Sequence, residues 1–115
     1  MKIFHLSNLS HGWIDVAFGQ ESDGYTIIAS DVPNDCLCDL ASATLRLLAG
    51  STEETVEFSL EPGSAICRLH RDSDSVQVVV TMPNQKGPVF DAIFPLSSFA
   101  KRLRFELLRI KPLDF

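Results

Sequence analysis

The side chains best suited to metal binding or redox chemistry are three histidines and three cysteines. His5, His11 and His70 show no i,i+4 spacing, whereas structural zinc ligands usually come in close pairs. Cys36 and Cys38 form C-x-C, not the C-x-x-C of redox motifs and zinc knuckles. On a helix these two side chains would point about 200° apart and would not pair. We therefore expect no metal, no cofactor and three small, buried or half-buried free thiols.

Two further groups of residues could suggest chemistry. Asp72-x-Asp74 begins like a calcium loop, but the later oxygen ligands and the closing Glu are missing, so a hairpin turn is expected there. Another group lies near the N-terminus and could be imagined as a nucleophile with its base: Ser7, Ser10, His11 and Asp15. No nucleophile elbow surrounds these residues. The sequence therefore predicts a protein that is not an enzyme.

The N-terminal part of the chain predicts two or three strands. Between Trp13 and Phe18, apolar and other residues alternate with the period of a half-buried strand. The turn-forming stretch from Gln20 to Gly24 joins it to a hairpin partner, Tyr25 to Ala29. A further short strand, from Lys2 to Leu6, would precede this hairpin.

An amphipathic helix is expected next, starting near Pro33 and Asn34, with Asp35 in its first turn and Gly50 just beyond its end. One broad apolar face is predicted to be buried. It comprises Leu37, Leu40, Ala41, Thr44, Leu45, Leu47 and Leu48. The opposite side carries Asp35, Asp39, Ser42 and Arg46.

Four more alternating runs follow, joined by short links. The runs are Thr55–Leu60, Ala65–His70, Val76–Thr81 and Val89–Phe94. Short links indicate an antiparallel meander, because parallel neighbours would need long crossovers. Val79 and Ile93 interrupt the polar side of their strands, which suggests that something, such as a helix, covers part of the second sheet face.

A final helix is predicted from an N-cap at Ser97 to about Arg109. Its inner face would contain Leu96, Phe99, Ala100, Leu103 and Leu107. Phe105 and Leu108 fall on the outer face among basic residues. The whole pattern predicts one α+β domain over residues 1–115, an antiparallel β-meander sheet with two helices in the order ββαββββα.

Composition narrows the class of protein further. The chain has 115 residues, 45% of them apolar and 22% charged, which suffices for a core without disulfides or metal. No apolar run approaches the roughly 18 residues of a membrane span. The N-terminal residues lack the apolar stretch of a signal peptide. We therefore expect a cytoplasmic protein that does not bind membranes.

Charge is distributed unevenly along the chain. The stretch from Glu21 to Glu61 carries nine acids and one base, Arg46, whereas the last fifteen residues carry five bases and two acids. The basic tail could contact phosphate, but the first hundred residues have a net charge of −8, which argues against nucleic-acid binding. The tail could instead be solvated or pair with the acids. The acids could serve solubility alone or form a surface for a basic partner.

We favour the binding surface. Its expected residues are Trp13, Asp31, Asp35, Asp39, Glu53, Glu54 and Glu57. On the predicted helix, Asp35 and Asp39 lie one turn apart. Trp13, the only Trp, lies on the strand face opposite Ile14, where it would be either covered by a helix or an anchor for a partner.

Two stretches give the chain a resemblance to a class of bacterial proteins. The segments SDVPNDCLCDL from Ser30 to Leu40 and FPLSSFAKRL from Phe94 to Leu103 resemble stretches of small immunity proteins of contact-dependent inhibition and other polymorphic toxin systems. The resemblance implies binding of a cognate toxin domain, frequently a nuclease, and no particular binding residue. The alternative is a structural or assembly domain that self-associates through Phe105 and Leu108.

Overall fold

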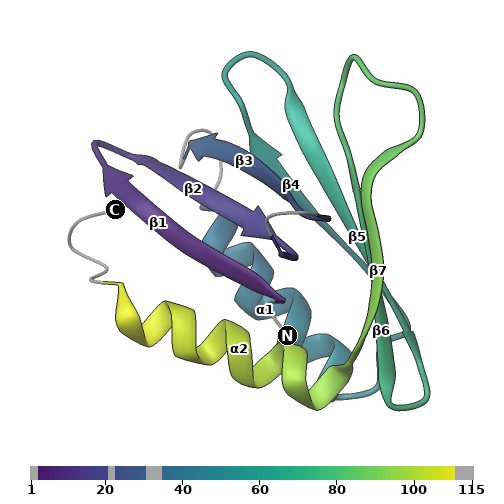
Figure 1. Ribbon diagram of the computed structural model, residues 1–115. Helices are drawn as coiled ribbons and strands as arrows, with labels where there is room; N and C mark the ends of the chain where they lie inside the picture. Colours follow the sequence, from purple (N-terminus) through teal and green to yellow (C-terminus); the bar gives the residue numbers. More distant parts are fainter. Residues whose placement is uncertain (1–2, 21–22, 31–34, 111–115) are drawn as a thin grey trace.

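The strands lie in one sheet in the order of the chain, each antiparallel to the next, and two helices accompany them (Figure 1). The computed structural model describes residues 3–20, 23–30 and 35–110. The bounds are β1 Phe4–Ser10, β2 Trp13–Phe18, β3 Tyr25–Ser30, α1 Cys36–Leu48, β4 Glu53–Ser59, β5 Ser64–Asp72, β6 Ser75–Thr81, β7 Pro88–Pro95 and α2 Leu96–Arg109. The α+β meander with two helices is confirmed, and the uncertain N-terminal strand is present as β1.

Tight turns join the strands as the sequence predicted. His11 and Gly12 connect β1 to β2 and both have positive φ, as a two-residue type I′ turn requires. Asp72 and Asp74 flank Ser73, which also has positive φ, in the turn between β5 and β6. The Asp-x-Asp pair therefore belongs to a hairpin.

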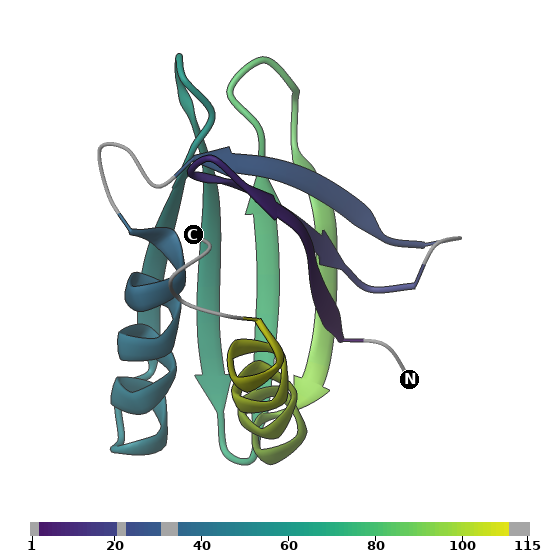
Figure 2. The same ribbon diagram turned by 90° about the vertical axis from the view of Figure 1, so that its left-hand side faces the viewer.

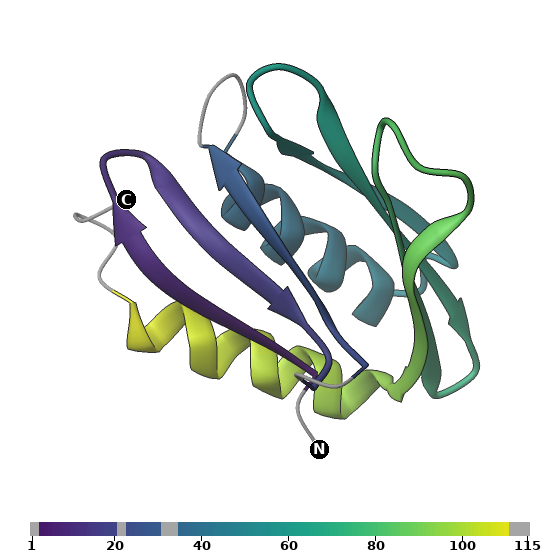
Figure 3. The same ribbon diagram turned by 45° about the horizontal axis from the view of Figure 1, so that its top comes forward.

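One joint divides the sheet into two groups of strands. β3 and β4 share a single register pair, Ser30 with Ser59, whereas every other neighbouring pair of strands is matched at five or more positions. Beyond this joint the groups β1–β3 and β4–β7 separate (Figure 3), and their strands run in different directions (Figure 2). The chain passes through α1 between the two strands that meet there.

Both helices lie in the angle between the two groups of strands (Figure 2). The inner side chains of the strands and one stripe of each helix form a single apolar core. Phenylalanines run through it in a chain of ring contacts with centroid separations of 5.8–6.4 Å: Phe99, Phe4, Phe18, Phe58, Phe90 and Phe94. These non-directional apolar contacts provide most of the driving force for folding.

The predicted inner face of α1 was too broad. Leu45 and Leu48 are 66% and 48% exposed, and Ala41 is half-buried. The core instead takes a narrower stripe around Leu40 and Leu47. The reason is that α1 packs mainly against β4 and has little contact with α2, so one side of its apolar arc stays uncovered.

The expectation that something covers the second sheet face was also wrong. Ile93 is 67% exposed and Val79 is half-buried, and neither helix lies on that side. Apolar residues on a solvated sheet face are common in proteins, so single interruptions of a polar pattern are weak evidence for a covering layer.

The two helices begin differently from the prediction. Asp35 is the N-cap of α1, and its carboxylate accepts a hydrogen bond from the Cys38 backbone N–H at 3.1 Å. α2 begins at Leu96 after Pro95, so Ser97 is not its cap. The Leu96 N–H donates instead to the Asp74 carbonyl at 2.7 Å. The predicted start signals Pro33 and Asn34 lie outside the described residues.

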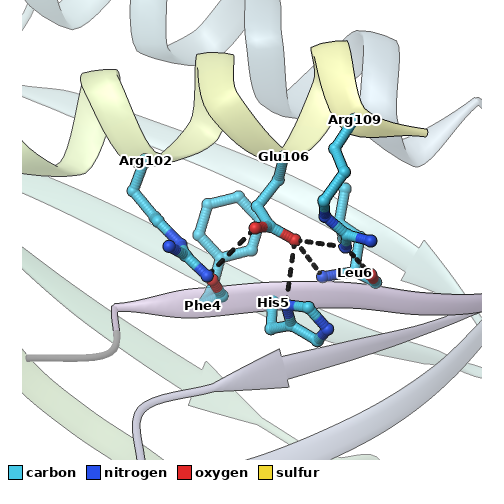
Figure 4. A network of polar contacts seen from close by, with 6 residues as sticks. All are labelled: Phe4, His5, Leu6, Arg102, Glu106 and Arg109. Carbon is cyan, nitrogen blue, oxygen red and sulfur yellow. Dashed lines mark hydrogen bonds and ion pairs between the residues drawn. The ribbon is translucent and has the colours of Figure 1, made fainter.

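Side chains of α2 cover the outer edge of β1 (Figure 4). β1 is an edge strand, so its outward backbone groups have no neighbouring strand. Glu106 accepts a hydrogen bond from the Leu6 N–H at 2.8 Å, and Arg102 donates through Nε to the Phe4 carbonyl at 3.0 Å. Arg109 donates to the Leu6 carbonyl. Three polar side chains thus take the place of a strand.

Glu106 is fully buried at the centre of this network. Its carboxylate oxygens lie 2.7 Å from Arg109, 3.0 Å from Arg102 and 3.2 Å from Nδ1 of His5. Burial raises the pKa of Glu106, but the hydrogen bonds from Arg109 and the Leu6 N–H and the charge of His5 outweigh this effect, so its pKa lies below the usual value. The predicted inner face of this helix did not include Glu106.

Replacing Glu106 is expected to destabilise the fold. Glu106→Gln should lower the free energy of unfolding by about 2–3 kcal/mol near pH 7 in urea titrations, because two arginines and a backbone N–H lose a charged acceptor. A carboxyl with a lowered folded-state pKa stabilises above its unfolded pKa, 4.5. This contribution is lost as the pH falls through the folded-state value.

The wild type should therefore lose more stability between pH 6 and about pH 3 than Glu106→Gln does. Asp72→Asn, at an exposed turn, is the matched control and should change stability little. Parallel pH profiles for wild type and Glu106→Gln would contradict this assignment.

Candidate protein-binding surfaces

Acidic side chains gather where α1 and β4 form one border of the molecule. Arg46 of α1 reaches Glu54 of β4, with Nε and Oε1 2.7 Å apart. The Ser51 hydroxyl donates to the other Glu54 oxygen at 2.7 Å. These hydrogen bonds, first from Ser51 and then from Arg46, lower the pKa of Glu54. Asp39 lies two helical turns before Arg46 and so projects from the same flank of α1.

Two more acids lie on the other side of β4. Val56 and Phe58 point into the core, so Glu53 and Glu57 point to the outer face of the sheet. Glu53 lies 2.5 Å from Nδ1 of His70. The Ser64 hydroxyl donates to Glu57 at 2.6 Å.

Trp13 lies on this outer face as well, close to the joint between β3 and β4. It pairs across strands with Ser30, which in turn pairs with Ser59. Trp13 is half-buried, and both helices lie on the other side of β1–β3 (Figure 2). Of the two predicted environments, under a helix or open to a partner, the structure shows the second.

We call the border formed by α1 and β4 the acidic edge. Its residues are Asp35, Asp39, Glu53, Glu54 and Glu57, with Arg46 on α1 beside Glu54 and Arg68 of the neighbouring β5 opposite Thr55, between Glu53 and Glu57. They occupy the two sides of one border and do not form one flat patch. Asp31, also predicted to bind the partner, lies outside the described residues.

The basic residues of α2 do not neutralise the acidic edge. Arg102 and Arg109 are held by Glu106 and by the backbone of β1. Lys101 and Arg104 make no ion pair within the part of the chain that the structure describes. Among the described residues, the bases of α2 therefore make no ion pair with the acids of the acidic edge.

An apolar groove lies between α1 and α2, on the flank of α1 that faces away from the acidic edge. Its volume is about 420 Å³. The lining residues are Ala41, Thr44, Leu45, Leu48, Ala100, Lys101, Leu103, Arg104, Leu107 and Leu108. Sequence reasoning assigned several of them to the core. The signal for a groove was present, because the apolar arc of α1 is wider than one sheet contact can bury.

Of the two residues predicted to mediate self-association, only Leu108 lines the groove. Leu108 is 72% exposed and lines the groove. Phe105 is 54% exposed and lies against the Arg102 guanidinium, 5.2 Å from the ring centroid. Phe105 is not a lining residue of the groove.

The remaining chemistry-bearing residues are dispersed. His11 lies in a turn and His70 lies on β5, while His5 contacts Glu106 and lines a separate cleft of about 280 Å³ with Tyr25 and Thr26. No group of three His, Cys, Asp or Glu side chains is placed to hold a metal ion within residues 3–20, 23–30 and 35–110. Neither described helix is long and apolar enough to cross a membrane.

Comparison with known proteins provides no further assignment. No protein-family model, curated protein or solved structure matches the chain.

Thiol chemistry tests the packing of α1. Cys36 and Cys67 are buried, and burial raises the pKa of each thiol to about 12, with the charge of Asp35 adding to the shift at Cys36. Cys38 is exposed. Because the thiolate is the reactive form, a chromogenic disulfide reagent should titrate one thiol in the native protein at pH 8 and all three in denaturant.

The variant Cys38→Ser should lose the rapid native reaction and keep two thiols that react only after unfolding. Rapid modification of two or three thiols in the folded wild type would contradict the observed burial of Cys36 and Cys67.

Proposed function

We propose that this protein is a non-catalytic immunity protein that binds a cognate toxin domain, a nuclease, and neutralises it. The observation that carries the proposal is the acidic edge. Five acids from one segment lie on both sides of the border between α1 and β4, and they outnumber the two arginines beside them, Arg46 and Arg68. The resemblance of the Ser30–Leu40 and Phe94–Leu103 segments to immunity proteins supports the same class.

Electrostatics favours such a pair. A nuclease must present cations to the phosphates of its substrate, so a protein that covers this surface benefits from carboxylates. Long-range attraction raises association rates to as much as roughly 10⁸–10⁹ M⁻¹s⁻¹ at low salt. Acids on both sides of a border fit a basic cleft better than a flat basic surface, because both sides face the walls of the cleft.

A desolvated anchor would add affinity to this attraction. Trp13 is half-buried on the outer face near the joint, on the same side of the sheet as Glu53 and Glu57. Tryptophan is enriched among residues that dominate binding energy. On its β3 side, β4 has no strand partner from Glu53 to Phe58 among the described residues, whereas β5 pairs with it along its whole length.

The test uses the C-terminal domain of the protein encoded by the neighbouring reading frame as the probe. Its association with the full chain should slow steeply with added salt in stopped-flow measurements. The double variant Asp39→Lys, Glu53→Lys should reduce the association rate by at least about tenfold at low salt. Asp35 is better changed to Asn, which removes the charge and keeps the helix cap.

The matched control is Asp72→Lys, Asp74→Lys, which makes the same charge change at the exposed turn between β5 and β6. It should slow association much less. Equal effects of the two double variants, or an association rate independent of salt, would contradict the acidic edge as the binding surface.

A second candidate is a self-associating structural domain. The observation that favours it is the exposure of Phe105 and Leu108 on α2. Light scattering on the purified chain, of mass 12.7 kDa, distinguishes the two functions. A dimer that dissociates in Leu108→Ser would favour this candidate, whereas a monomer at high concentration would remove it.

A further inference from the structure

The groove between α1 and α2 is a surface that the proposed function does not use. We propose that it is a second docking site, which binds an acidic amphipathic helix of a partner protein. The groove is separate from the proposed toxin-binding surface, because the acidic edge lies on the opposite flank of α1.

Exposed leucines are concentrated in this groove. Six large apolar side chains are exposed in the described part of the chain. Three of them, Leu45, Leu48 and Leu108, line this one groove. Groove-binding helices insert apolar residues at i, i+3 or i+4 and i+7 between such side chains.

The basic residues on α2 indicate the charge of the occupant. Lys101 and Arg104 line the groove, are exposed, and have no ion-pair partner among the described residues. None of the described acids lines the groove, since Asp39 projects from the other flank of α1. A helix with Glu or Asp beside its apolar stripe therefore complements both the apolar lining of the groove and its two bases, Lys101 and Arg104.

The same charges disfavour a second copy of this chain. In a two-fold contact the same patch meets itself. Lys101 and Arg104 of two copies would then approach each other, and no lining carboxylate would offset their repulsion. An acidic helix from another protein avoids this cost.

The lining also disfavours a small polar ligand. Specific small-molecule sites combine an apolar wall with a few convergent polar groups. Among the described lining residues, Thr44 is the one polar side chain besides the two bases, and its hydroxyl donates to the Leu40 carbonyl at 2.8 Å. Little remains to orient a small molecule.

The experiment uses designed peptides and the full chain. One peptide of about 18 residues, long enough to form a helix, carries Leu at i, i+4, i+7 and i+11 with Glu on both sides of this stripe. A matched peptide carries Lys in place of Glu. Fluorescence anisotropy should show the Glu peptide binding at least about tenfold more tightly than the Lys peptide.

Substitutions in the chain locate the binding. Leu45→Ser and Leu108→Ser should each weaken binding of the Glu peptide by about tenfold, and both residues are exposed, so folding should be retained. The double variant Lys101→Glu, Arg104→Glu should reverse the preference between the two peptides. The controls Ile93→Ser and Lys86→Glu change exposed residues outside the groove and should leave binding unchanged.

Three results would overturn the proposal. They are equal affinity for the Glu and Lys peptides, no binding of the Glu peptide at millimolar concentration, and binding that the groove variants do not alter. A dimer of the unliganded chain that Leu45→Ser and Leu108→Ser both dissociate would assign the groove to a second copy instead.

Discussion

The arrangement of the whole molecule depends on the single register pair that joins β3 to β4, Ser30 with Ser59. Because α1 is inserted between these strands, the two groups of the sheet diverge, and both helices fill the angle between them (Figure 2). The same divergence leaves the β3 side of β4 without a strand partner from Glu53 to Phe58 among the described residues and places α1 along β4. The acidic edge is a direct consequence of this joint.

The two flanks of α1 therefore have different chemistry. One flank joins β4 and carries carboxylates, with Arg46 bridging to Glu54. The other faces α2 across an apolar groove that Lys101 and Arg104 also line. Arg102 and Arg109 do not offset the acids of α1 and β4. They instead hold α2 against the edge of β1 through Glu106. A small domain of this kind can offer a cationic partner and an acidic helix separate surfaces.

Much of the fold could be predicted because its signals are local. Alternation and turn residues indicate each hairpin, and the period of α1 indicates the helix. The predictions that were wrong concern burial, which depends on contacts between distant segments. The exposure of Leu45 depends on where α2 packs, and the burial of Glu106 depends on β1, about a hundred residues earlier. The acids were predicted as one surface, but only β4 pairing shows that they lie on two sides of a border.

The most direct test of the proposed toxin binding through the acidic edge is hydrogen–deuterium exchange of the chain, free and in the presence of the C-terminal domain encoded by the neighbouring reading frame. The account predicts slower exchange on binding in residues 36–46 of α1 and 53–59 of β4, with β6 and β7 unchanged. Protection confined to β6 and β7, or a complex without added protection at α1 and β4, would contradict it.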